Sequence, residues 1–311
     1  MNGSAINLIK KMGPLIGLTI LFVIISVLNS SFLEISNLQN LLRQVSINAI
    51  IAFGMTFVIL TSGIDLSVGS ILALSSAFMA NFIVGGMNPV FAILVSAIIG
   101  LMLGAINGCV IAYGKVAPFI ATLATMTIYR GATLVFTNGN PISGLTQDEF
   151  FLGFGQGDVL GLPVPAFTMF VAFLFLWFIL QKTSLGRHTY AVGGSEKVSF
   201  IAGIKINRIK IFAYALTGML SAIAGAIITA RLNSAQPTAG TGYELDAIAA
   251  VVLGGTSLAG GKGHIVGTLI GALIIGTLNN GLNILDVSSF YQQVVKGIVI
   301  LLAVLADRKK S

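Results

Sequence analysis

Apolar residues occur along this chain in long blocks that are separated by short polar segments. Ten blocks stand out, at about residues 14–29, 48–62, 66–84, 90–113, 119–136, 164–181, 211–231, 246–260, 265–285 and 291–306. A helix needs about 20 apolar residues to cross a bilayer core roughly 30 Å thick, and several blocks are shorter or are cut by Gly, Asn and Ser. The pattern predicts an all-α polytopic membrane protein with about ten transmembrane helices, some of them short or broken.

The composition agrees with lipid as the main solvent. Of the 311 residues, 56% are hydrophobic and 9% are charged, whereas about a quarter of an average soluble domain is charged. Ten spans of about 20 residues use roughly 200 positions, so we expect one transmembrane domain over residues 1–311. The net charge of +7 does not indicate nucleic-acid binding, because the basic residues are scattered between apolar blocks. Cys109 is the only cysteine, which excludes an internal disulfide framework and a cysteine-rich metal site.

Lysine and arginine predict the orientation, because basic loops stay on the cytoplasmic side. If the N-terminus is inside and ten spans alternate, 13 of the 17 basic residues are cytoplasmic, while Arg43 and Arg231 are external. We therefore expect both termini in the cytoplasm. Arg130 and Lys296 lie within apolar blocks. We interpret them as anchors that reach a membrane interface, with a pore-facing role as the alternative.

A weak internal repeat appears when the chain is shifted by 198 residues. Residues 48–74 then align with residues 246–272 without a gap, and seven of the 27 positions are identical. Duplicated halves are common in membrane transporters, whose solute sites lie where the repeats meet. We place the two halves around residues 45–140 and 211–306. The aligned copies lie six spans apart and so point the same way, whereas an inverted repeat requires an odd offset.

Both aligned copies contain a glycine-rich polar break, at residues 61–67 and 254–263. Irregular backbone at membrane depth is tolerated only against protein or water, and hydroxyls, amides and free peptide groups can exchange hydrogen bonds with a neutral polyol. We therefore treat polar residues of the breaks and nearby spans as candidates for a translocation path, with helix-to-helix hydrogen bonds as the alternative role for the asparagines. The candidates are Asn48, Thr61, Ser62, Asp65, Ser67, Asn107, Thr256, Ser257, Asn279 and Asn280.

The chain lacks the groups that usually energise transport. A carrier coupled to protons or sodium ions generally buries an acidic residue or a histidine in a span. Our assignment puts all ten acids, Asp65 and Asp246 among them, in loops, tails or helix ends, and it puts His188 and His264 in cytoplasmic loops. The sequence also has no GxxxxGK[ST] phosphate-binding loop. We therefore expect any driving energy to come from a partner.

The longest internal loop, residues 182–210, is the candidate docking surface for that partner. Its sequence predicts a turn at Gly186-Arg187, then a short helix that begins with Ser195 as N-cap, carries Glu196 in its first turn and stops at Gly203. Such a helix would transmit movement from a soluble ATPase better than a flexible connector. A solvated basic loop that only satisfies the topology is the alternative.

In this loop and in several longer segments the sequence resembles the permease subunits of bacterial ABC sugar importers. The resemblance covers most of the chain from about Phe32 to Lys310. It is carried by TSGIDLSVGS (61–70), APFIATLATM (117–126), TNGNPI (137–142), the GR, AVGG and GI elements of 186–204, ARLNSAQPTAGTGYELDAIAAVVLGGTSLAGGKG (230–263) and VGTLIGALIIGTLNNGLNIL (266–285).

The resemblance implies a homodimer of permeases around one pore in the bacterial plasma membrane. It also implies an ATPase subunit that binds ATP and Mg²⁺, an extracytoplasmic sugar-binding protein, and no cofactor or metal on this chain itself. D-ribose is the cargo that the resemblance favours, although permeases for xylose and galactose share the glycine-rich segments. The family's ATPase-coupling loop is matched by Gly186, Arg187, Gly193, Gly194, Glu196 and Gly203, while Glu196-Lys197-Val198 stands where many importers have Glu-Ala-Ala.

Three other functions stay open from the sequence. A proton-linked sugar carrier would transport alone under a proton gradient, and a passive channel would conduct without ATP or partners. An intramembrane enzyme would need a nucleophile, a base and an orienting group, which the few titratable residues do not supply.

Overall fold

A computed structural model describes residues 3–308, and this part of the chain is almost entirely helical. It contains the α-helices α1 (Gly3–Leu28), α2 (Ile35–Leu60), α3 (Val68–Val84), α4 (Pro89–Ala112), α5 (Pro118–Thr137), α6 (Glu149–Gln156), α7 (Val164–Lys182), α8 (Ser184–Gly194), α9 (Glu196–Ile201), α10 (Ile206–Leu232), α11 (Tyr243–Leu253), α12 (Ile265–Ile284) and α13 (Ser289–Arg308). A 3-10 turn, η1 (Ser30–Leu33), joins α1 to α2. Two short antiparallel pairs are β1 (Ile142–Ser143) with β4 (Ser234–Ala235), and β2 (Asp158–Val159) with β3 (Leu162–Pro163). The predicted all-α polytopic fold is confirmed.

Each of the ten apolar blocks coincides with a helix. Six helices, α2, α4, α5, α7, α10 and α12, are long and apolar enough to cross a membrane, while α3 and the apolar parts of α1 and α13 are shorter. α2 begins at Ile35, well before the block predicted from residue 48, because its first turns carry polar side chains near the surface. α11 ends at Leu253, because Gly254 and Gly255 follow and Gly255 has a φ of +86°.

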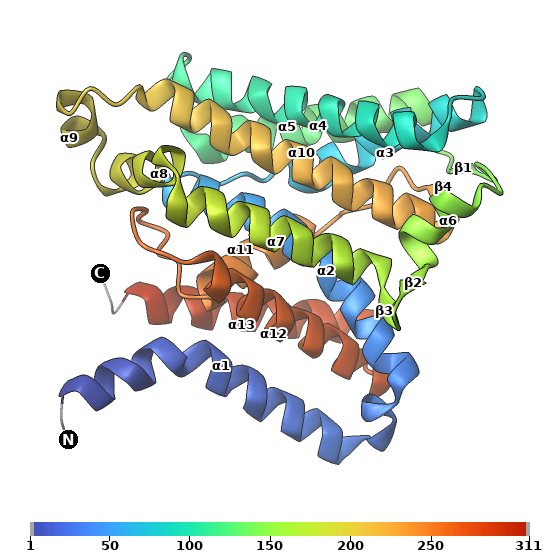
Figure 1. The fold of residues 1–311 in the computed structure, drawn as a ribbon, viewed down its shortest axis with the longest axis horizontal. Helices are drawn as coiled ribbons and strands as arrows, with labels where there is room; N and C mark the ends of the chain where they lie inside the picture. Colours follow the sequence, from blue (N-terminus) through green and yellow to red (C-terminus); the bar gives the residue numbers. More distant parts are fainter. Residues whose placement is uncertain (1–2, 309–311) are drawn as a thin grey trace.

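The helices run between two ends of the molecule (Figure 1). One end carries α8, α9, the beginning of α1 and the end of α13, and we call it the α8 end. The opposite end, which we call the α6 end, carries α6 and both strand pairs. The first and last helices therefore begin and finish at the same end as the basic segment 182–210.

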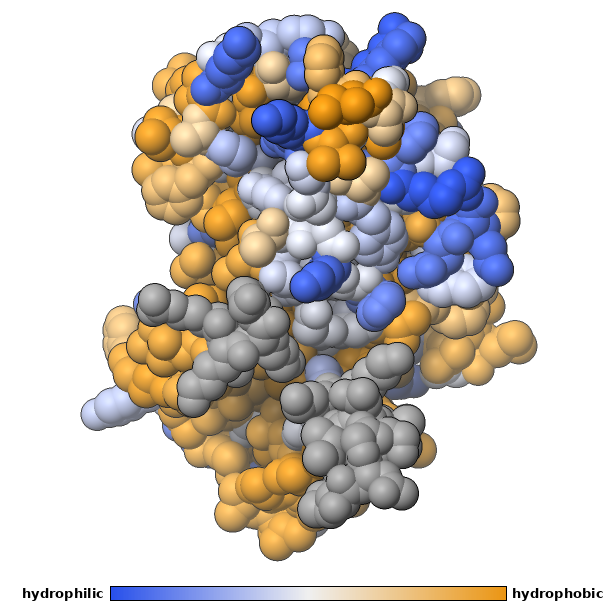
Figure 2. Space-filling model, turned by 90° about the vertical axis from the view of Figure 1, so that its left-hand side faces the viewer, coloured by the Kyte–Doolittle hydropathy of each residue, from blue (hydrophilic) through white to orange (hydrophobic). Residues whose placement is uncertain are grey.

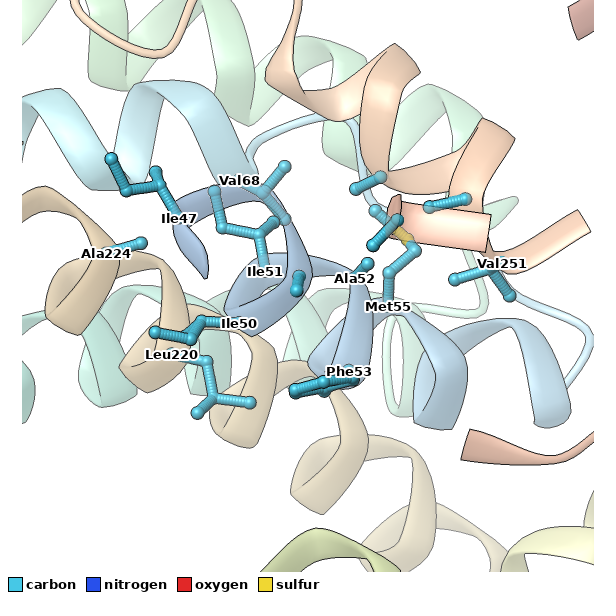
Figure 3. Close-up of a cluster of buried hydrophobic side chains, with 14 of the residues drawn as sticks. Ile47, Ile50, Ile51, Ala52, Phe53, Met55, Val68, Leu220, Ala224 and Val251 are labelled. Atoms are coloured by element: carbon cyan, nitrogen blue, oxygen red, sulfur yellow. The ribbon is translucent and has the colours of Figure 1, made fainter. Parts of the chain in front are cut away.

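α2 is the central helix of the fold. Every residue from Ala49 to Leu60 is buried, and α10, α12, α7 and α11 pack around it. Figure 3 shows Ile50 beside Leu220 of α10, and Ile51 beside Val68 of α3. A helix that is apolar around its whole circumference has to be enclosed by other helices. α2 therefore provides the surface against which the other spans are positioned.

α3 and α11 are short helices, and each is preceded by extended chain. Residues 61–67 lead from the α8 end to α3, and residues 236–242 lead from the α6 end to α11 (Figure 1). The two beginnings touch inside the molecule, where a Cβ atom on Gly69 would collide with Gly240 O. Because only glycine leaves room for this approach, the crossing of the two broken spans depends on both residues.

Among the residues described, α4 and α10 form the most extensive helix pair, and glycines spaced four residues apart lie at their contact. Gly100 and Gly104 of α4 lie against Gly218 and Tyr214 of α10, and a Cβ atom on either α4 glycine would collide with a backbone carbonyl of α10. Small residues at this spacing allow helices to associate where lipid supplies no hydrophobic driving force.

The outward faces of the long helices are apolar. Large exposed side chains include Phe91 and Ile98 on α4, Phe119 on α5, Phe175 on α7 and Leu302 on α13. Isolated exposed apolar residues are normal on soluble proteins, but continuous coverage of several helices indicates a lipid-facing surface.

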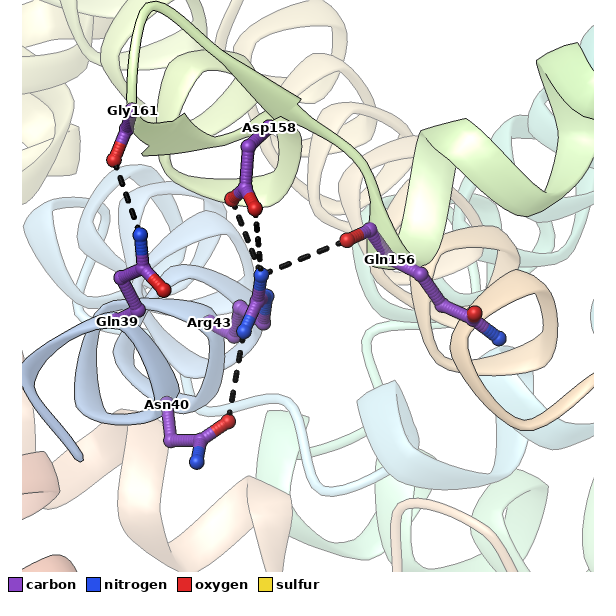
Figure 4. Close-up of polar contacts among 6 residues, drawn as sticks. All are labelled: Gln39, Asn40, Arg43, Gln156, Asp158 and Gly161. Atoms are coloured by element: carbon purple, nitrogen blue, oxygen red, sulfur yellow. Dashed lines mark hydrogen bonds and ion pairs between the residues drawn. The ribbon is translucent and has the colours of Figure 1, made fainter. Parts of the chain in front are cut away.

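Polar side chains form a hydrogen-bonded cluster at the α6 end (Figure 4). Arg43 Nη2 donates to Asp158 Oδ1 at 3.0 Å and to Gln156 O at 3.4 Å, and Gln39 Nε2 donates to Gly161 O at 3.2 Å. These contacts connect the polar first turns of α2 to the chain between α6 and α7.

Gly104→Ala should lower the thermal stability of the purified chain in detergent, because the added methyl group overpacks the α4–α10 contact, typically at a cost of about 1–3 kcal/mol. Gly131→Ala on α5 is the matched control, since a Cβ there has nothing within 4 Å and alanine favours the helix. Equal unfolding temperatures for the two variants would contradict the glycine packing.

Candidate transport site

The two polar breaks predicted from the sequence lie side by side at the α8 end. Gly261 N–H donates to Leu60 O at 3.0 Å, and the Ser62 hydroxyl donates to Ala259 O at 2.8 Å. Ser62 is left-handed, with a φ of +61°, and Gly261 has a φ of +70°. Both loops therefore turn sharply where they touch.

α8 packs directly on both breaks. The Ser62 hydroxyl also lies 3.3 Å from Gly193 O. Gly193 has no room for a side chain, because a Cβ atom there would collide with Leu60 O and lie 2.6 Å from Gly261 N. We call the contacts among Leu60, Ser62, Gly193 and Gly261 the α8 junction. It joins the predicted docking segment to both broken regions of the chain.

The predicted docking segment consists of two helices. Gly186 N–H donates to the Thr183 side chain, which caps α8, so Gly186 and Arg187 lie in the first turn of a helix and the predicted turn is wrong. α9 is the short helix that the sequence predicts: the Ser195 side chain caps it by accepting from Val198 N–H at 3.3 Å. Gly203, with a φ of +77°, follows its end.

The other residues of the predicted coupling loop face different surroundings. Glu196 pairs with Lys210 at 2.6 Å, which ties α9 to the first turns of α10. Gly194 lies against Gly261, and Arg187 is exposed. The loop is therefore anchored by its glycines and presents its charged residues outward.

α9 exposes large apolar side chains. Val198 is 65% exposed, Phe200 74% and Ile201 76%. Figure 2 looks onto this end and shows hydrophilic side chains over much of its upper half, with apolar side chains among and beside them. An apolar ridge on an otherwise polar end is typical of a protein contact surface.

Three of the predicted path residues form a closed buried cluster. Ser67 donates to Asp65 Oδ1 from its backbone N–H at 2.9 Å and from its hydroxyl at 2.6 Å, and Asn107 Nδ2 donates to Ser67 Oγ at 2.7 Å. Tyr129 OH then donates to Asn107 Oδ1 at 3.3 Å. Asp65, Ser67 and Asn107 are fully buried. These groups hold the extended segment before α3 against α4 and α5.

Asn48 and Asn279 instead line a polar cavity of about 250 Å³ between α2, α11, α12 and α13. Asn280, next in sequence, turns away and exchanges side-chain hydrogen bonds of 3.1 and 2.9 Å with Asn37 of α2. The cavity is lined by Gln44, Ile47, Asn48, Arg231, Tyr243, Asp246, Gly276, Asn279, Asn283, Gln292 and Lys296.

Most of the cavity's polar lining was missed by the sequence analysis, although a signal for it exists. The side chains come in pairs separated by four positions on one helix, at Gln44 and Asn48, at Asn279 and Asn283, and at Gln292 and Lys296. Residues four apart lie on the same helix face. Paired polar residues in apolar spans therefore mark the faces that meet at the cavity.

The remaining path candidates lie within the breaks. Thr61 Oγ1 donates to Val58 O at 2.8 Å, and Ser257 Oγ accepts from Ala259 N–H at 3.3 Å. Thr256 is buried, and its hydroxyl is without a hydrogen-bond partner among the residues described. These residues shape the loops of the α8 end and do not line the cavity.

Asp65 and Asp246 lie in a break and at a helix end as the sequence predicts, but the inference that acids at such positions stay outside the helical body is wrong. Asp65 is fully buried in the first break, and Asp246 is 4% exposed in α11, where it accepts from Lys296 Nζ at 3.0 Å. The hydropathy pattern could not predict the burial of either acid, because each stands beside a helix break whose sequence resembles a surface loop. Lys296 is consequently an ion-pair partner within the helical body and not an interface anchor.

Arg130 is not an interface anchor either. Its Nη1 atom donates to Pro237 O at 2.6 Å and to Ala239 O at 2.9 Å. Both carbonyls belong to the extended segment before α11, which has no helical partners for them. Arg130 therefore supplies the hydrogen bonds that such a segment needs at membrane depth.

With this geometry established, comparison with known proteins places the chain in a family. A family described as the branched-chain amino acid transport system / permease component matches residues 37–304. The chain belongs to this family of multi-pass membrane permeases, and it is a transporter component and not an enzyme.

Individual relatives are similar over nearly their whole length. The chain is 67% identical to the ribose import permease protein RbsC of Bacillus subtilis (strain 168) over 305 residues, covering 98% of this chain and 95% of the relative. It is 56% identical to RbsC of Escherichia coli (strain K12), covering 96% and 93%. It is 42% identical to the D-allose transport system permease protein AlsC of E. coli (strain K12), covering 93% and 90%. No solved structure matches the chain.

Removing one partner of the Asp246–Lys296 pair should destabilise the chain more than removing both. Asp246→Asn or Lys296→Met leaves an uncompensated charge, which costs up to about 3–5 kcal/mol when buried, whereas the double variant leaves none. Unfolding temperatures in detergent would measure this. Additive losses in the double variant would mean that the two charges do not interact.

Proposed function

We propose that this chain is the transmembrane subunit of an ATP-binding cassette importer that carries a monosaccharide, D-ribose, into the bacterial cell. The observation that carries the proposal is the 67% identity to a ribose import permease over almost the whole of both chains. The sequence has no GxxxxGK[ST] motif, so ATP and Mg²⁺ would be bound by a separate ATPase subunit.

The α8 end is the proposed docking face for the ATPase. Its exposed apolar residues on α9 offer a contact surface, and the α8 junction connects this surface to both breaks. The same end carries basic residues such as Lys115, Lys182 and Lys262. Because basic loops remain cytoplasmic, we place both termini and the α8 end in the cytoplasm.

Two further partners belong to the proposal. An extracytoplasmic sugar-binding protein would dock at the α6 end, and a second copy of the permease would complete a homodimer in the plasma membrane. The resemblance to ABC sugar importers supports both. The roles of Gly186, Arg187, Gly193, Gly194, Glu196 and Gly203 in ATPase coupling are part of the same proposal.

We also propose that the chain contains an inverted repeat of α2–α5 and α10–α13. Each set has a long helix, extended chain, a short helix and two further helices, and the corresponding helices run in opposite directions in Figure 1. The identities between residues 48–74 and 246–272 relate different elements, the two helix–break–helix segments that meet at the α8 end. The proposed sets, residues 35–137 and 206–308, overlap the halves predicted around residues 45–140 and 211–306.

Coupling would act through the α8 junction. ATP binding by the partner would move α8 and α9, and Gly193 would transmit that movement to Leu60 and Gly261, which it touches. Shifting a two-state equilibrium from 1:99 to 99:1 requires about 5.5 kcal/mol of differential binding. Nucleotide binding and subunit contacts can supply a free energy of this size.

The proposal can be tested by reconstituting the permease in liposomes with its ATPase and sugar-binding protein. Uptake of labelled D-ribose should require all three proteins and ATP, because the permease supplies a path without a motor. A proton-linked carrier, which the relatives do not favour, would use buried acids such as Asp65 or Asp246. Accumulation of ribose by the permease alone under a proton gradient would establish that alternative.

Replacing Glu196 with Ala and Gly203 with Val together should reduce ATP-driven uptake at least tenfold while ATP hydrolysis continues. The change removes the α9–α10 ion pair and strains a left-handed position. Glu149→Ala with Gly139→Val is the matched control at the α6 end, since Gly139 has a φ of +71° and open space around it. Normal uptake by the α9 variant would overturn the coupling assignment.

A further inference from the structure

The polar cavity has hydrogen-bonding groups that the protein leaves unused. Asn48 Oδ1 on α2 and Asn279 Oδ1 on α12 are buried and accept no hydrogen bond from any residue described. A buried polar atom without a partner is costly, which makes such atoms rare unless a ligand or water completes them. Two of them on facing helices of one cavity indicate a site that is completed by a bound molecule.

The groups around the cavity suit a ligand rich in hydroxyl groups. The Asp246 carboxylate on the cavity wall is already compensated by Lys296 at 3.0 Å, and the two open groups are neutral acceptors. Arg231 at the end of α10 adds a guanidinium with several donors. Hydroxyl groups can donate to the amide oxygens and accept from the guanidinium, so the set of groups matches a compact polyol.

The position of the cavity suits a transport intermediate. Asn48 lies about 20 Å from the start of α2 at a rise of 1.5 Å per residue, which is near the middle of the helical body. Asp246 stands in the first turn of α11, the short helix after an extended segment. Transporters commonly bind solutes at such depths beside interrupted helices.

We propose that this cavity binds a single neutral monosaccharide during translocation. The inference rests on the proposed importer function and adds to it a defined binding site, with Asn48 and Asn279 as its hydrogen-bond acceptors. The volume of 250 Å³ is far above the roughly 10–15 Å³ that one water requires. The cavity therefore has room for a sugar ring.

Asparagine-to-leucine variants separate a binding role from a structural one. Asn48→Leu and Asn279→Leu remove unpartnered acceptors, so the unfolding temperature without sugar should stay the same or rise. Asn280→Leu is the neighbouring control. It breaks the hydrogen bonds to Asn37 and should lower the unfolding temperature without removing a cavity group.

Binding is measured by the rise in unfolding temperature of the purified full chain when D-ribose, D-allose or L-arabinose is added. At least one monosaccharide should stabilise the unmodified chain and the Asn280→Leu variant. Asn48→Leu and Asn279→Leu should lose the stabilisation. Water as the only occupant, seen as no stabilisation of the unmodified chain by any of the three monosaccharides, would overturn the inference.

Transport by the complete importer provides the second readout. Each cavity variant should lower the maximal rate of ATP-driven D-ribose uptake by about tenfold, the effect of losing roughly one hydrogen bond in the path. The KM should stay unchanged if the binding protein captures the sugar first. Unaltered uptake by both cavity variants would overturn the inference even though the importer works. An unmodified importer that moves no ribose with ATP would instead refute the proposed function, and the stabilisation experiment would still decide the cavity.

Discussion

The need to pair every backbone polar group within the membrane governs this structure. A helix pairs its backbone groups within itself, but the extended segments 61–67 and 236–242 cannot. Side chains of neighbouring helices supply hydrogen bonds to these segments. Arg130 donates to two carbonyls of residues 236–242, and Thr122 and Tyr214 donate to Ile64 O in residues 61–67. The broken spans can therefore exist only at the centre of the bundle, where neighbouring helices bring these donors.

The two buried acids, Asp65 and Asp246, have different structural roles. Asp65 belongs to a chain of hydrogen bonds through Ser67 and Asn107 that fixes the path of the backbone, although its Oδ2 atom accepts no hydrogen bond from the residues described. Asp246 is neutralised by Lys296 at the wall of a cavity whose amide oxygens remain open. The first network holds an extended segment of the chain in place, whereas the groups beside Asp246 line a cavity. The distinction lies in geometry and not in residue type.

The sequence predicted the spans well, because hydropathy reports on lipid exposure along whole helices. It also predicted α9, since Ser195 and Gly203 are local signals for the beginning and end of a helix. It failed for Asp246, Lys296 and Arg130, whose roles depend on partners far away along the chain. The sequence also could not show that Asn279 lines the cavity while Asn280 bonds to Asn37, because these neighbours differ only in the helix face from which each projects.

α2 reaches both functional regions of the chain. Leu60 at its end belongs to the α8 junction, and Asn48, three turns earlier, stands at the cavity. A rigid helix that serves two sites makes their occupancies interdependent. If movement at α8 alters the affinity of the cavity for a solute, then the solute must alter the energetics of α8 by the same factor. Binding of the sugar in the cavity would then affect the ATPase, just as movement of the ATPase affects the cavity.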